Sequence, residues 1–378
     1  SAQRGRLGLP GTEDQVAQIQ ITGLGGDARD IPGETLDALA ARLEGTLIFP
    51  DDEGFAEAIL VWNGMIKKQP ALVVRPSSTK DVVQTVDFVR DNDLVLSIKG
   101  GGHNIAGLAL SDGGITLDMS GMRAVEVDVE ARLARVGPGC TLGDVDQATQ
   151  VHGLASTLGF VSATGVAGLT LGGGFGYLTR RFGWTVDDLE EVEIVTADGQ
   201  VRRASRADND DLFWALRGGG GNFGVVTEFV LRLHAVGPQV TAGIIAWPAS
   251  EAEAVLQLYR RTVESSPREL TTVVLRRNAP PAPWLPEAAH GTPIQAMARP
   301  DSGADDANRE WVRSAWRALK PYSTGGNYVN FQTEEEADER TVESYRDNYQ
   351  RLATIRAKYD PSNLFRVNRN IRPLLRAA

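Results

Sequence analysis

The sequence predicts an α+β fold in which strands and helices follow one another without a regular βαβ alternation. Residues 192–205 alternate apolar and polar side chains on both sides of Asp198-Gly199, which is typical of a β-hairpin. Residues 77–93 begin with a Ser/Thr cap and continue with apolar residues at helical spacing. At 378 residues, the chain is long enough for two domains or for one large domain with an insertion.

The first part of the chain mixes short strands with amphipathic helices. Residues 1–33 lack an apolar core stretch, and we expect them to form a flexible leader. Up to the first glycine cluster, the patterns predict helices at 34–45, 55–64 and 77–93 and strands at 46–50, 71–76 and 94–99. Strands at 114–120, 124–130, 133–139 and 222–236 and helices at 141–153 and 208–218 complete this part.

The composition changes after residue 236. Strand patterns at 240–249 and 270–279 flank a helix at 251–264, and a proline-rich loop follows. The closing part of the chain predicts a helix at 307–323, a strand at 325–331 and a helix at 340–360.

Charge and cysteine content exclude several classes of partner and site. The net charge of −10 argues against a nucleic-acid or anionic-membrane partner, because binding to phosphates requires clustered Lys and Arg. Cys140 is the only cysteine, so the chain can form neither an internal disulfide framework nor a cysteine-rich metal site. No apolar run reaches the roughly 18 residues that span a bilayer. We expect a cytoplasmic protein, with export after removal of a leader as the alternative.

Three glycine clusters, at 100–104, 164–176 and 217–226, are the strongest local signal. Glycine permits tight turns and close strand packing, but three clusters favour a backbone that approaches a large ligand, since bare amides can bind a pyrophosphate. His103 directly follows the first cluster, whereas His152, His234 and His290 have ordinary structural settings. No second histidine or cysteine pair stands near His103 at ligand spacing, so we expect no metal.

Gly219, Gly221 and Gly224 match the G-x-G-x-x-G pattern of dinucleotide-binding folds. In those folds the pattern follows a strand and opens a helix. Here a helix precedes the glycines and a strand follows them, so we exclude an NAD(P)-binding site of that type.

Five segments carry a specific resemblance. IKGGGHNIAG, VGPGCTLGDVDQAT, GVAGLTLGGGFGYLTRRFGW, DLFWALRGGGGNFGVVTEF and KYDPSNLFRVNRNI occur in this order. They resemble the FAD-linked oxidases of the berberine bridge enzyme group, within the vanillyl-alcohol oxidase and p-cresol methylhydroxylase superfamily. The 6-hydroxynicotine oxidase branch is the most similar. The resemblance covers residues 36–236 and 308–372.

This resemblance implies a two-part FAD-binding domain of the p-cresol methylhydroxylase type with an inserted antiparallel-sheet substrate domain. We expect the N-terminal part of the FAD-binding domain at 34–236, the substrate domain at 237–325 and the return of the FAD-binding domain at 326–378. The insertion offers few strand candidates, so it is either shortened or incompletely represented in this sequence. We favour the second explanation, because strands without partners leave apolar faces and edges uncovered.

The cofactor residues are likewise implied by the resemblance. In the family, the histidine of the GGH motif is covalently attached to the 8α methyl of the flavin, which implies this role for His103. The glycine loop around it would bind the FAD pyrophosphate through backbone amides. The other cofactor-binding residues that the resemblance implies, with those of the loop, are Gly100, Gly101, Gly102, Asn104, Thr164, Gly165, Gly168, Gly172, Gly173, Gly174, Val226, Asn368 and Asn370.

One feature departs from the family pattern. Many relatives carry a second link from a cysteine to the flavin, but the matching place here is close to Val161. Cys140 lies in another motif, at a predicted helix N-terminus, which can lower the pKa of a thiol and make it reactive. We therefore expect a single covalent link through His103, with a link to Cys140 as the alternative.

The expected reaction is the transfer of hydride from an alcohol, sugar or amine carbon to flavin N5, with molecular oxygen reoxidising the flavin. Tyr328 matches an active-site tyrosine of relatives and would act as the base, helped by a neighbouring cation or hydrogen bonds. The modest size of Thr164 favours an oxidase. A flavin dehydrogenase with another electron acceptor and a non-catalytic flavin-binding protein with a degenerate cap stay open as alternatives. The expected partners are a small-molecule substrate and oxygen, and the oligomeric state stays open.

Overall fold

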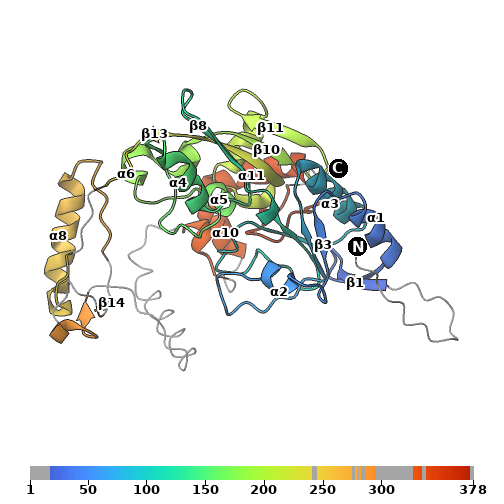
Figure 1. Ribbon diagram of the computed structural model, residues 1–378, viewed down its shortest axis with the longest axis horizontal. Helices are drawn as coiled ribbons and strands as arrows, with labels where there is room; N and C mark the ends of the chain where they lie inside the picture. The colour runs from blue at the N-terminus through green and yellow to red at the C-terminus, as the bar shows by residue number, and fades with distance from the viewer. Residues whose placement is uncertain are drawn as a thin grey trace.

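The computed structural model describes residues 18–240, 245–274, 277–279, 281, 287–294, 327–333 and 338–374. Two sheets organise the described part of the chain (Figure 1). The larger sheet is antiparallel and has the order β11 (Val201–Ser205), β10 (Leu189–Val195), β12 (Val225–Arg232), β8 (Leu133–Val136) and β7 (Val125–Asp128). The smaller sheet has the order β3 (Thr46–Ile48), β4 (Leu72–Arg75), β6 (Ile115–Asp118) and β5 (Leu96–Lys99).

The smaller sheet contains the only long-range parallel pairing among these strands. Strand β6 pairs parallel with both β4 and β5, whereas β3 pairs antiparallel with β4. Strands and helices therefore mix without a regular alternation, which confirms the predicted α+β class. The predicted hairpin is also confirmed, because β10 and β11 pair antiparallel around a turn in which Gly199 has a φ of +76°.

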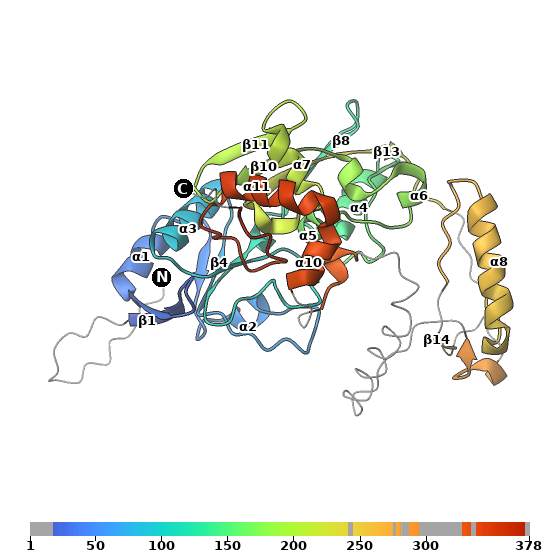
Figure 2. The same cartoon turned by 180° about the vertical axis from the view of Figure 1, so that it is seen from behind.

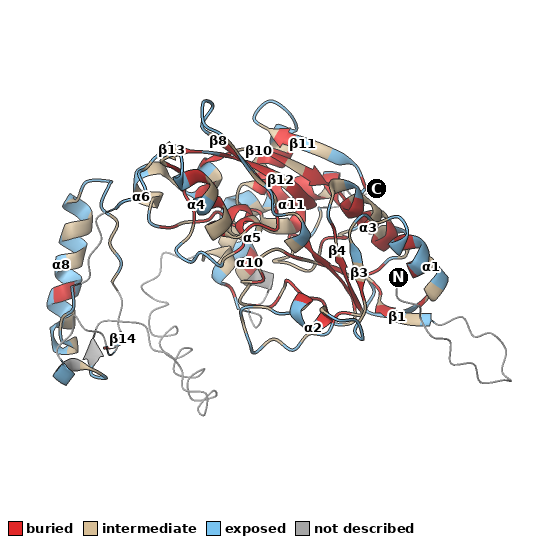
Figure 3. Cartoon of the chain, viewed as in Figure 1, coloured by how far each residue is buried: buried red, intermediate tan, exposed pale blue. Residues whose placement is uncertain are grey.

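Each sheet has its own hydrophobic core. The core of the larger sheet includes Val192, Ile194 and Phe229 and receives side chains from α4 (Leu142–Gln150), α5 (Val166–Leu171), α7 (Asp210–Leu216) and α11 (Tyr349–Tyr359). The core of the smaller sheet includes Leu72 and Leu117 and is covered by α1 (Gly33–Ala40) and α3 (Thr79–Asp91). Figure 3 shows buried stretches, in red, along both sheets.

The expectation of a flexible leader up to residue 33 is wrong for its second half. Strands β1 (Gln18–Thr22) and β2 (Ala28–Pro32) form an antiparallel hairpin. Ile21 and Ile31 of this hairpin belong to the core of the smaller sheet, and the backbone of Thr22 bonds to Gly113 and Val95. A short alternating segment thus gains enough burial from a distant sheet to fold, which its own composition does not reveal.

The predicted helix at 55–64 is much shorter in the structure. Helix α2 covers only Phe55–Ala58. Beyond it, the Trp62 amide donates to the carbonyl oxygen of Gly102, and the Asn63 side chain donates to that of Ile105. These hydrogen bonds to the glycine loop take the place of helical hydrogen bonds. The apolar residues after Ala58 therefore lie in a loop, although their spacing is typical of a helix.

Helix α8 (Ala252–Ser265) is set apart from the two sheets and is confirmed as a helix (Figures 1 and 2). The strands expected around it are not: residues 245–247 and 270–274 are irregular, and only the short β14 (Arg277–Asn278) and β15 (Pro293–Ile294) form a pair. No broad partner sheet stands beside them in the described residues, so the strand pattern has nothing to pair with. The helix expected at 307–323 lies outside the described residues.

The closing part of the chain also differs from the expectation. Residues 340–360 form two helices, α10 (Asp338–Tyr345) and α11, because Arg346 between them has a φ of +48°. The remaining elements are the short β9 (Leu154–Ala155), β13 (His234–Ala235) and α6 (Thr179–Phe182). No helix among the described residues is both long and apolar enough to cross a membrane.

Candidate functional site

A cavity of about 420 Å³ lies where the loop after β5, the loop before β12 and the C-terminal segment meet. The smaller sheet contributes Ile98 of β5 and Met119, which follows β6, to the cavity wall. The larger sheet contributes Val225, the first residue of β12. Most of the site residues predicted from the sequence line this cavity: Gly100, Gly101, Gly102, His103, Asn104, Thr164, Gly165, Gly168, Val226, Tyr328 and Asn368. The structure therefore brings separate sequence motifs to one place.

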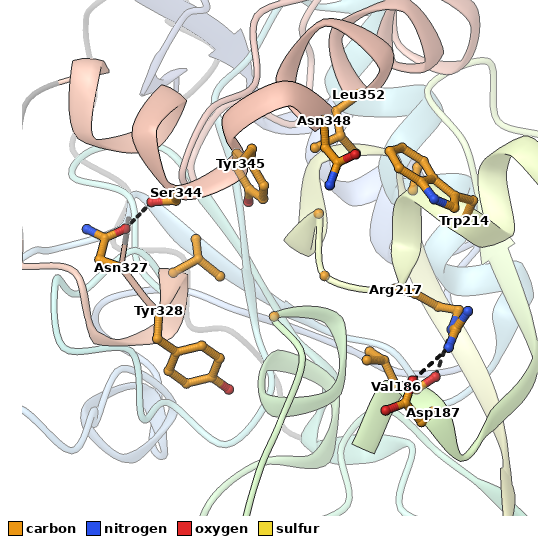
Figure 4. A pocket seen from close by; sticks show the side chains of 15 residues that line it. Val186, Asp187, Trp214, Arg217, Asn327, Tyr328, Ser344, Tyr345, Asn348 and Leu352 are labelled. Carbon is orange, nitrogen blue, oxygen red and sulfur yellow. Dashed lines mark hydrogen bonds and ion pairs between the residues drawn. The ribbon is translucent and has the colours of Figure 1, made fainter. Parts of the chain in front are cut away.

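The other predicted residues lie close by. Gly172 lines a second cavity of about 390 Å³, which shares Tyr328 and Tyr345 with the first and is shown in Figure 4. Gly173 and Gly174 follow it and contact Tyr328. Asn370 lines neither cavity, and its buried side-chain oxygen has no hydrogen-bond partner among the described residues.

The backbone donors at the start of the loop that follows β5 have no partners among the described residues. None of the N–H groups of residues 100–104 donates a hydrogen bond to any residue that the structure describes. Gly102 has a φ of +69°, which glycine adopts without strain. Buried backbone donors are almost always paired, so a run of free amides at a cavity wall indicates a site for an acceptor-rich group such as a phosphate.

The glycines of this site have different roles. A side chain on Gly101 would place its Cβ 2.4 Å from the backbone nitrogen of Gly165, and one on Gly165 would reach 2.3 Å from that of Gly101. These two glycines let two loops touch. Gly168, by contrast, lines the cavity and would meet nothing within 4 Å if it carried a Cβ. It leaves space for a ligand beside α5.

His103 is held at the cavity wall by two neighbours. Its Nδ1 lies 3.5 Å from the hydroxyl of Thr164, and its ring stacks on Trp62 with centroids 6.0 Å apart and planes inclined by 22°. Burial lowers the pKa of the imidazole below its ordinary value, and an interaction with the backbone of Ala163 opposes this in part. The neutral imidazole, which is the nucleophilic form, is therefore favoured near neutral pH. Trp62 carried no sequence signal for this role.

Tyr328 has a more defined setting than the sequence predicts. It does not lie in a strand, as expected, but precedes a 3-10 turn at Val329–Phe331, because its carbonyl accepts from Phe331. Its hydroxyl oxygen accepts hydrogen bonds from the Gly174 amide at 3.0 Å and from Nδ2 of Asn330 at 2.9 Å. Burial raises the pKa of Tyr328, and these two hydrogen bonds lower it in part. Asn330 was not identified from the sequence.

The alternative of a reactive Cys140 is wrong. The side chain is fully buried in the core of the larger sheet, and its Sγ–H donates to the carbonyl oxygen of Ala124 at 3.5 Å. Burial raises the pKa of the thiol to about 11. Helix α4 begins only at Leu142, so its N-terminus does not offset the burial. Cys140 does not line the cavity, whereas Val161 does.

The other histidines do not take part in the cavity. His234 stacks on Phe182 and lies with Nε2 2.7 Å from a carboxylate oxygen of the buried Asp188, which fits the structural role expected from the sequence. Neither it, His152 nor His290 lines either cavity. Among the described residues, no group of three or more His, Cys, Asp or Glu side chains could hold a metal ion.

These residues fit a bound FAD. The free amides of 100–104 offer donors to a pyrophosphate, and Gly168 leaves open space beside them. The Asn368 side chain donates to the carbonyl oxygens of Gly221 and Phe365, but its own buried oxygen has no partner among the described residues. That oxygen is an acceptor available to a donor group on a cofactor.

Comparisons with known proteins agree with this site. Residues 70–205 match a family model described as FAD binding domain, and residues 327–372 match one described as berberine and berberine like. The two matches contain the loop with His103 and the turn with Tyr328, respectively.

Two curated relatives match about the same part of the chain. An (R)-6-hydroxynicotine oxidase of Paenarthrobacter nicotinovorans is 39% identical over 216 residues, covering 57% of this chain and 47% of the relative. An FAD-linked oxidoreductase, pgmH, of Aspergillus terreus is 38% identical over 215 residues, covering 56% and 44%. The chain thus spans about half the length of the curated relatives it matches.

Solved structures share the fold over most of the chain. The crystal structure of 6-hydroxy-D-nicotine oxidase from Arthrobacter nicotinovorans has a TM-score of 0.71 and 26% identity, covering 88% of this chain and 98% of that one. Phl p 4, a grass pollen allergen with glucose dehydrogenase activity, has a TM-score of 0.77 at 20% identity over 90% and 100%. The latter likeness shows the fold alone. The chain therefore contains an FAD binding domain match and a berberine-like match, and over about half of its length it is similar to 6-hydroxynicotine oxidase.

Proposed function

We propose that this chain binds FAD in the 420 Å³ cavity and acts as an FAD-dependent oxidoreductase on a small molecule. The observation that carries the proposal is the run of free amides at 100–104, next to His103 in a cavity that also contains Tyr328. A site for phosphates, a nucleophilic imidazole and a phenol are thus combined in one space. The FAD when bound would supply the acceptor for a hydride from an alcohol, sugar or amine carbon.

His103 is proposed as the single covalent attachment point of the cofactor. Its pKa is lowered by burial, so the neutral imidazole is the form available to form a bond. Trp62 stacks on the ring, and the Thr164 hydroxyl lies near its Nδ1. Val161 and not a cysteine lies at the cavity wall, and Cys140 is buried elsewhere, so no second link is proposed.

Tyr328 is proposed as the group that exchanges a proton with the substrate. It lines the cavity from the C-terminal segment, far from the glycine loop in the sequence. Phe175, Trp184 and Phe331 surround its ring at centroid distances of 5.3, 5.9 and 5.0 Å. These rings pack against the Tyr328 ring, and the Gly174 amide and the Asn330 side chain orient its hydroxyl.

An oxidase is proposed in preference to a dehydrogenase. Thr164 lies beside His103 at the cavity wall, and its modest size would leave room for oxygen to reach the flavin there. The 39% identical relative is named an oxidase. Molecular oxygen would then reoxidise the flavin.

Anaerobic reduction tests the proposed activity directly. The holoprotein is mixed in the absence of oxygen with a panel of alcohols, sugars and cyclic amines, including 6-hydroxynicotine. We expect one class to bleach the flavin colour, and the colour to return on admission of air. Tyr328→Phe should bleach at least about 100-fold more slowly with the same compound, because general acid-base catalysis contributes about that factor or more.

Two results would contradict the proposal. A yellow protein that no compound of the panel bleaches would support a non-catalytic flavin-binding protein. A protein that bleaches but recovers its colour only with an artificial acceptor would replace the oxidase with a dehydrogenase. The proton-transfer role of Tyr328 fails if the phenylalanine variant bleaches at the rate of the unchanged protein.

A further inference from the structure

The hydroxyl of Tyr328 has both of its acceptor positions filled. A phenol oxygen carries one hydrogen and two lone pairs. The Gly174 amide donates to this oxygen at 3.0 Å, and Nδ2 of Asn330 donates at 2.9 Å. The only position left free is the one that carries the proton. Tyr328 can therefore exchange its own proton with a substrate but cannot accept a third hydrogen bond while it is protonated.

Asn330 reaches this position because its neighbour is a glycine. A Cβ on Gly172 would lie 2.2 Å from Oδ1 and 2.4 Å from Nδ2 of Asn330. Gly172 has a φ of −90°, which any residue can adopt, so its backbone does not require glycine. The space that a side chain would take is instead occupied by the Asn330 amide, which also donates to the carbonyl oxygen of Leu169 at 3.4 Å.

We propose that Asn330 is a positioning residue that acts through Tyr328, and that Gly172 is required as a glycine because it admits the Asn330 side chain. With the Gly174 amide, Asn330 stabilises the phenolate that forms when Tyr328 gives up its proton. Hydrogen bonds from neutral donors strengthen when the acceptor becomes charged, so they favour the ionised form. This inference rests on the proposed function and assigns a role to two residues beyond it.

The other charged and titratable groups around Tyr328 do not account for the stabilisation of its phenolate. His103 and Arg369 line the first cavity with it, Asp187 and Arg217 line the second, and Tyr345 lines both. Asp187 is paired with Arg217 at 3.0 Å, as Figure 4 shows, and Arg369 donates to the carbonyl oxygen of Thr333. The described residues that lower the pKa of Tyr328 against the effect of burial are Asn330 and Gly174.

The test measures the pKa of Tyr328 in the holoprotein by nuclear magnetic resonance, with an isotopic label at Cζ of tyrosine. Tyr328→Phe identifies the resonance among the seven tyrosines. Asn330→Leu keeps the branched shape but removes the donor, and it should raise the pKa by about one to two units, as expected for one hydrogen bond to a charged group. Gly172→Ala should raise it in the same direction, because the methyl group displaces the Asn330 amide.

A double-mutant cycle supplies the control. In an Asn330→Gly background the side chain that would collide with the added methyl group is gone, so Gly172→Ala should cause no further shift. An unchanged pKa in Asn330→Leu overturns the proposal, as does a Gly172→Ala shift of equal size in both backgrounds. If Asn330→Leu does not fold, the Gly172 cycle decides alone.

This measurement is independent of the proposed function. The pKa of Tyr328 can be determined even if no substrate bleaches the flavin. Where a substrate is found, the pH profile of bleaching in Asn330→Leu should move to higher pH by the same amount as the pKa. A changed pKa with an unchanged profile would retain the hydrogen-bonding role and overturn the link to proton transfer.

Discussion

Individual glycines in this chain are required for different physical reasons, although they stand in similar motifs. Gly101 and Gly165 allow two loops to touch, Gly168 leaves space in the cavity, and Gly172 admits a neighbouring side chain. The sequence groups them all as residues that approach a cofactor. The contact of Gly101 with Gly165 joins motifs far apart in the chain, so no local pattern separates these roles.

The contrast between Gly101 and Gly168 gives a prediction. Gly101→Ala should lower the free energy of unfolding by about 1 to 3 kcal/mol, because its methyl group would overlap the Gly165 backbone. Gly168→Ala should keep or raise that free energy, since alanine is favoured in the helix α5, but it should lower the bound FAD content. Denaturant unfolding and the flavin absorbance per chain measure the two effects. Equal losses of stability in both variants would contradict this division.

His103 and its neighbour Thr164 were predictable from the sequence, whereas Trp62 and Asn330 were not. His103 follows from the glycine cluster before it and from the family resemblance. Trp62 and Asn330 contact His103 and Tyr328 only because distant or irregular segments meet. Their sequence surroundings predict a helix and a strand, respectively, and neither element forms at those residues.

At the scale of elements, the sequence correctly predicts helices and strands that are stabilised by residues close to them in the chain. Helix α3 and the β10–β11 hairpin carry their own cap or turn, and both are confirmed. The hairpin of β1 and β2 depends on burial of Ile21 against a distant sheet. The segment after α2 depends on hydrogen bonds to the glycine loop. Both were misjudged because their stabilising contacts are distant in the sequence.

Asp81 joins α3 to the segments around it and provides a pH-dependent prediction. Its carboxylate accepts from the backbone amides of Glu44, Gly45 and Ser77 at 2.8 to 2.9 Å. Burial raises its pKa, but these hydrogen bonds and that of the Ser77 hydroxyl outweigh burial, so the pKa lies below its ordinary value. Asp81→Asn should therefore lower the free energy of unfolding by about 2 to 3 kcal/mol at neutral pH.

The sign of the pH dependence follows from the lowered pKa. Asp81 stabilises the folded state fully above its unfolded pKa of about 4, and the contribution is lost as the pH falls through the lower folded value. The difference in the free energy of unfolding between the unchanged protein and Asp81→Asn should therefore become smaller below about pH 4. Asp87→Asn is the control on the same helix, because its ion pair with Arg90 is half-exposed and should contribute less than about 1 kcal/mol. A difference that stays constant down to acid pH would refute the account.

At the scale of the whole molecule, the C-terminal segment holds the two sheets together. Leu352 and Ile371 pack in the core of the larger sheet, whereas Leu364 and Phe365 pack in that of the smaller sheet. The Asn222 side chain binds this segment: its Nδ2 donates to the carbonyl oxygen of Arg369, and its Oδ1 accepts from the amide of Ile371. The same segment carries Asn368 to the cavity. This segment thus both joins the two cores and forms part of the cavity wall.

The part of the fold around α8 was the least predictable. Its helix is amphipathic and forms as expected, but Leu256 and Leu258 are exposed and Val255 is its only buried residue among those described (Figure 3). Arg180 holds its C-terminal end through the carbonyl oxygens of Val263 and Ser266. Strand patterns beside this helix form no sheet because a strand needs a partner, which local sequence does not supply.

The attachment of FAD through His103 is the claim on which the proposed function depends most. The protein is denatured, separated on a gel and examined for flavin fluorescence in the protein band, with His103→Ala and Cys140→Ala beside it. We predict a fluorescent band that is lost in His103→Ala and kept in Cys140→Ala, since Cys140 is buried away from the cavity. A band without fluorescence in the unchanged protein, whose flavin is released on denaturation, would contradict the covalent link.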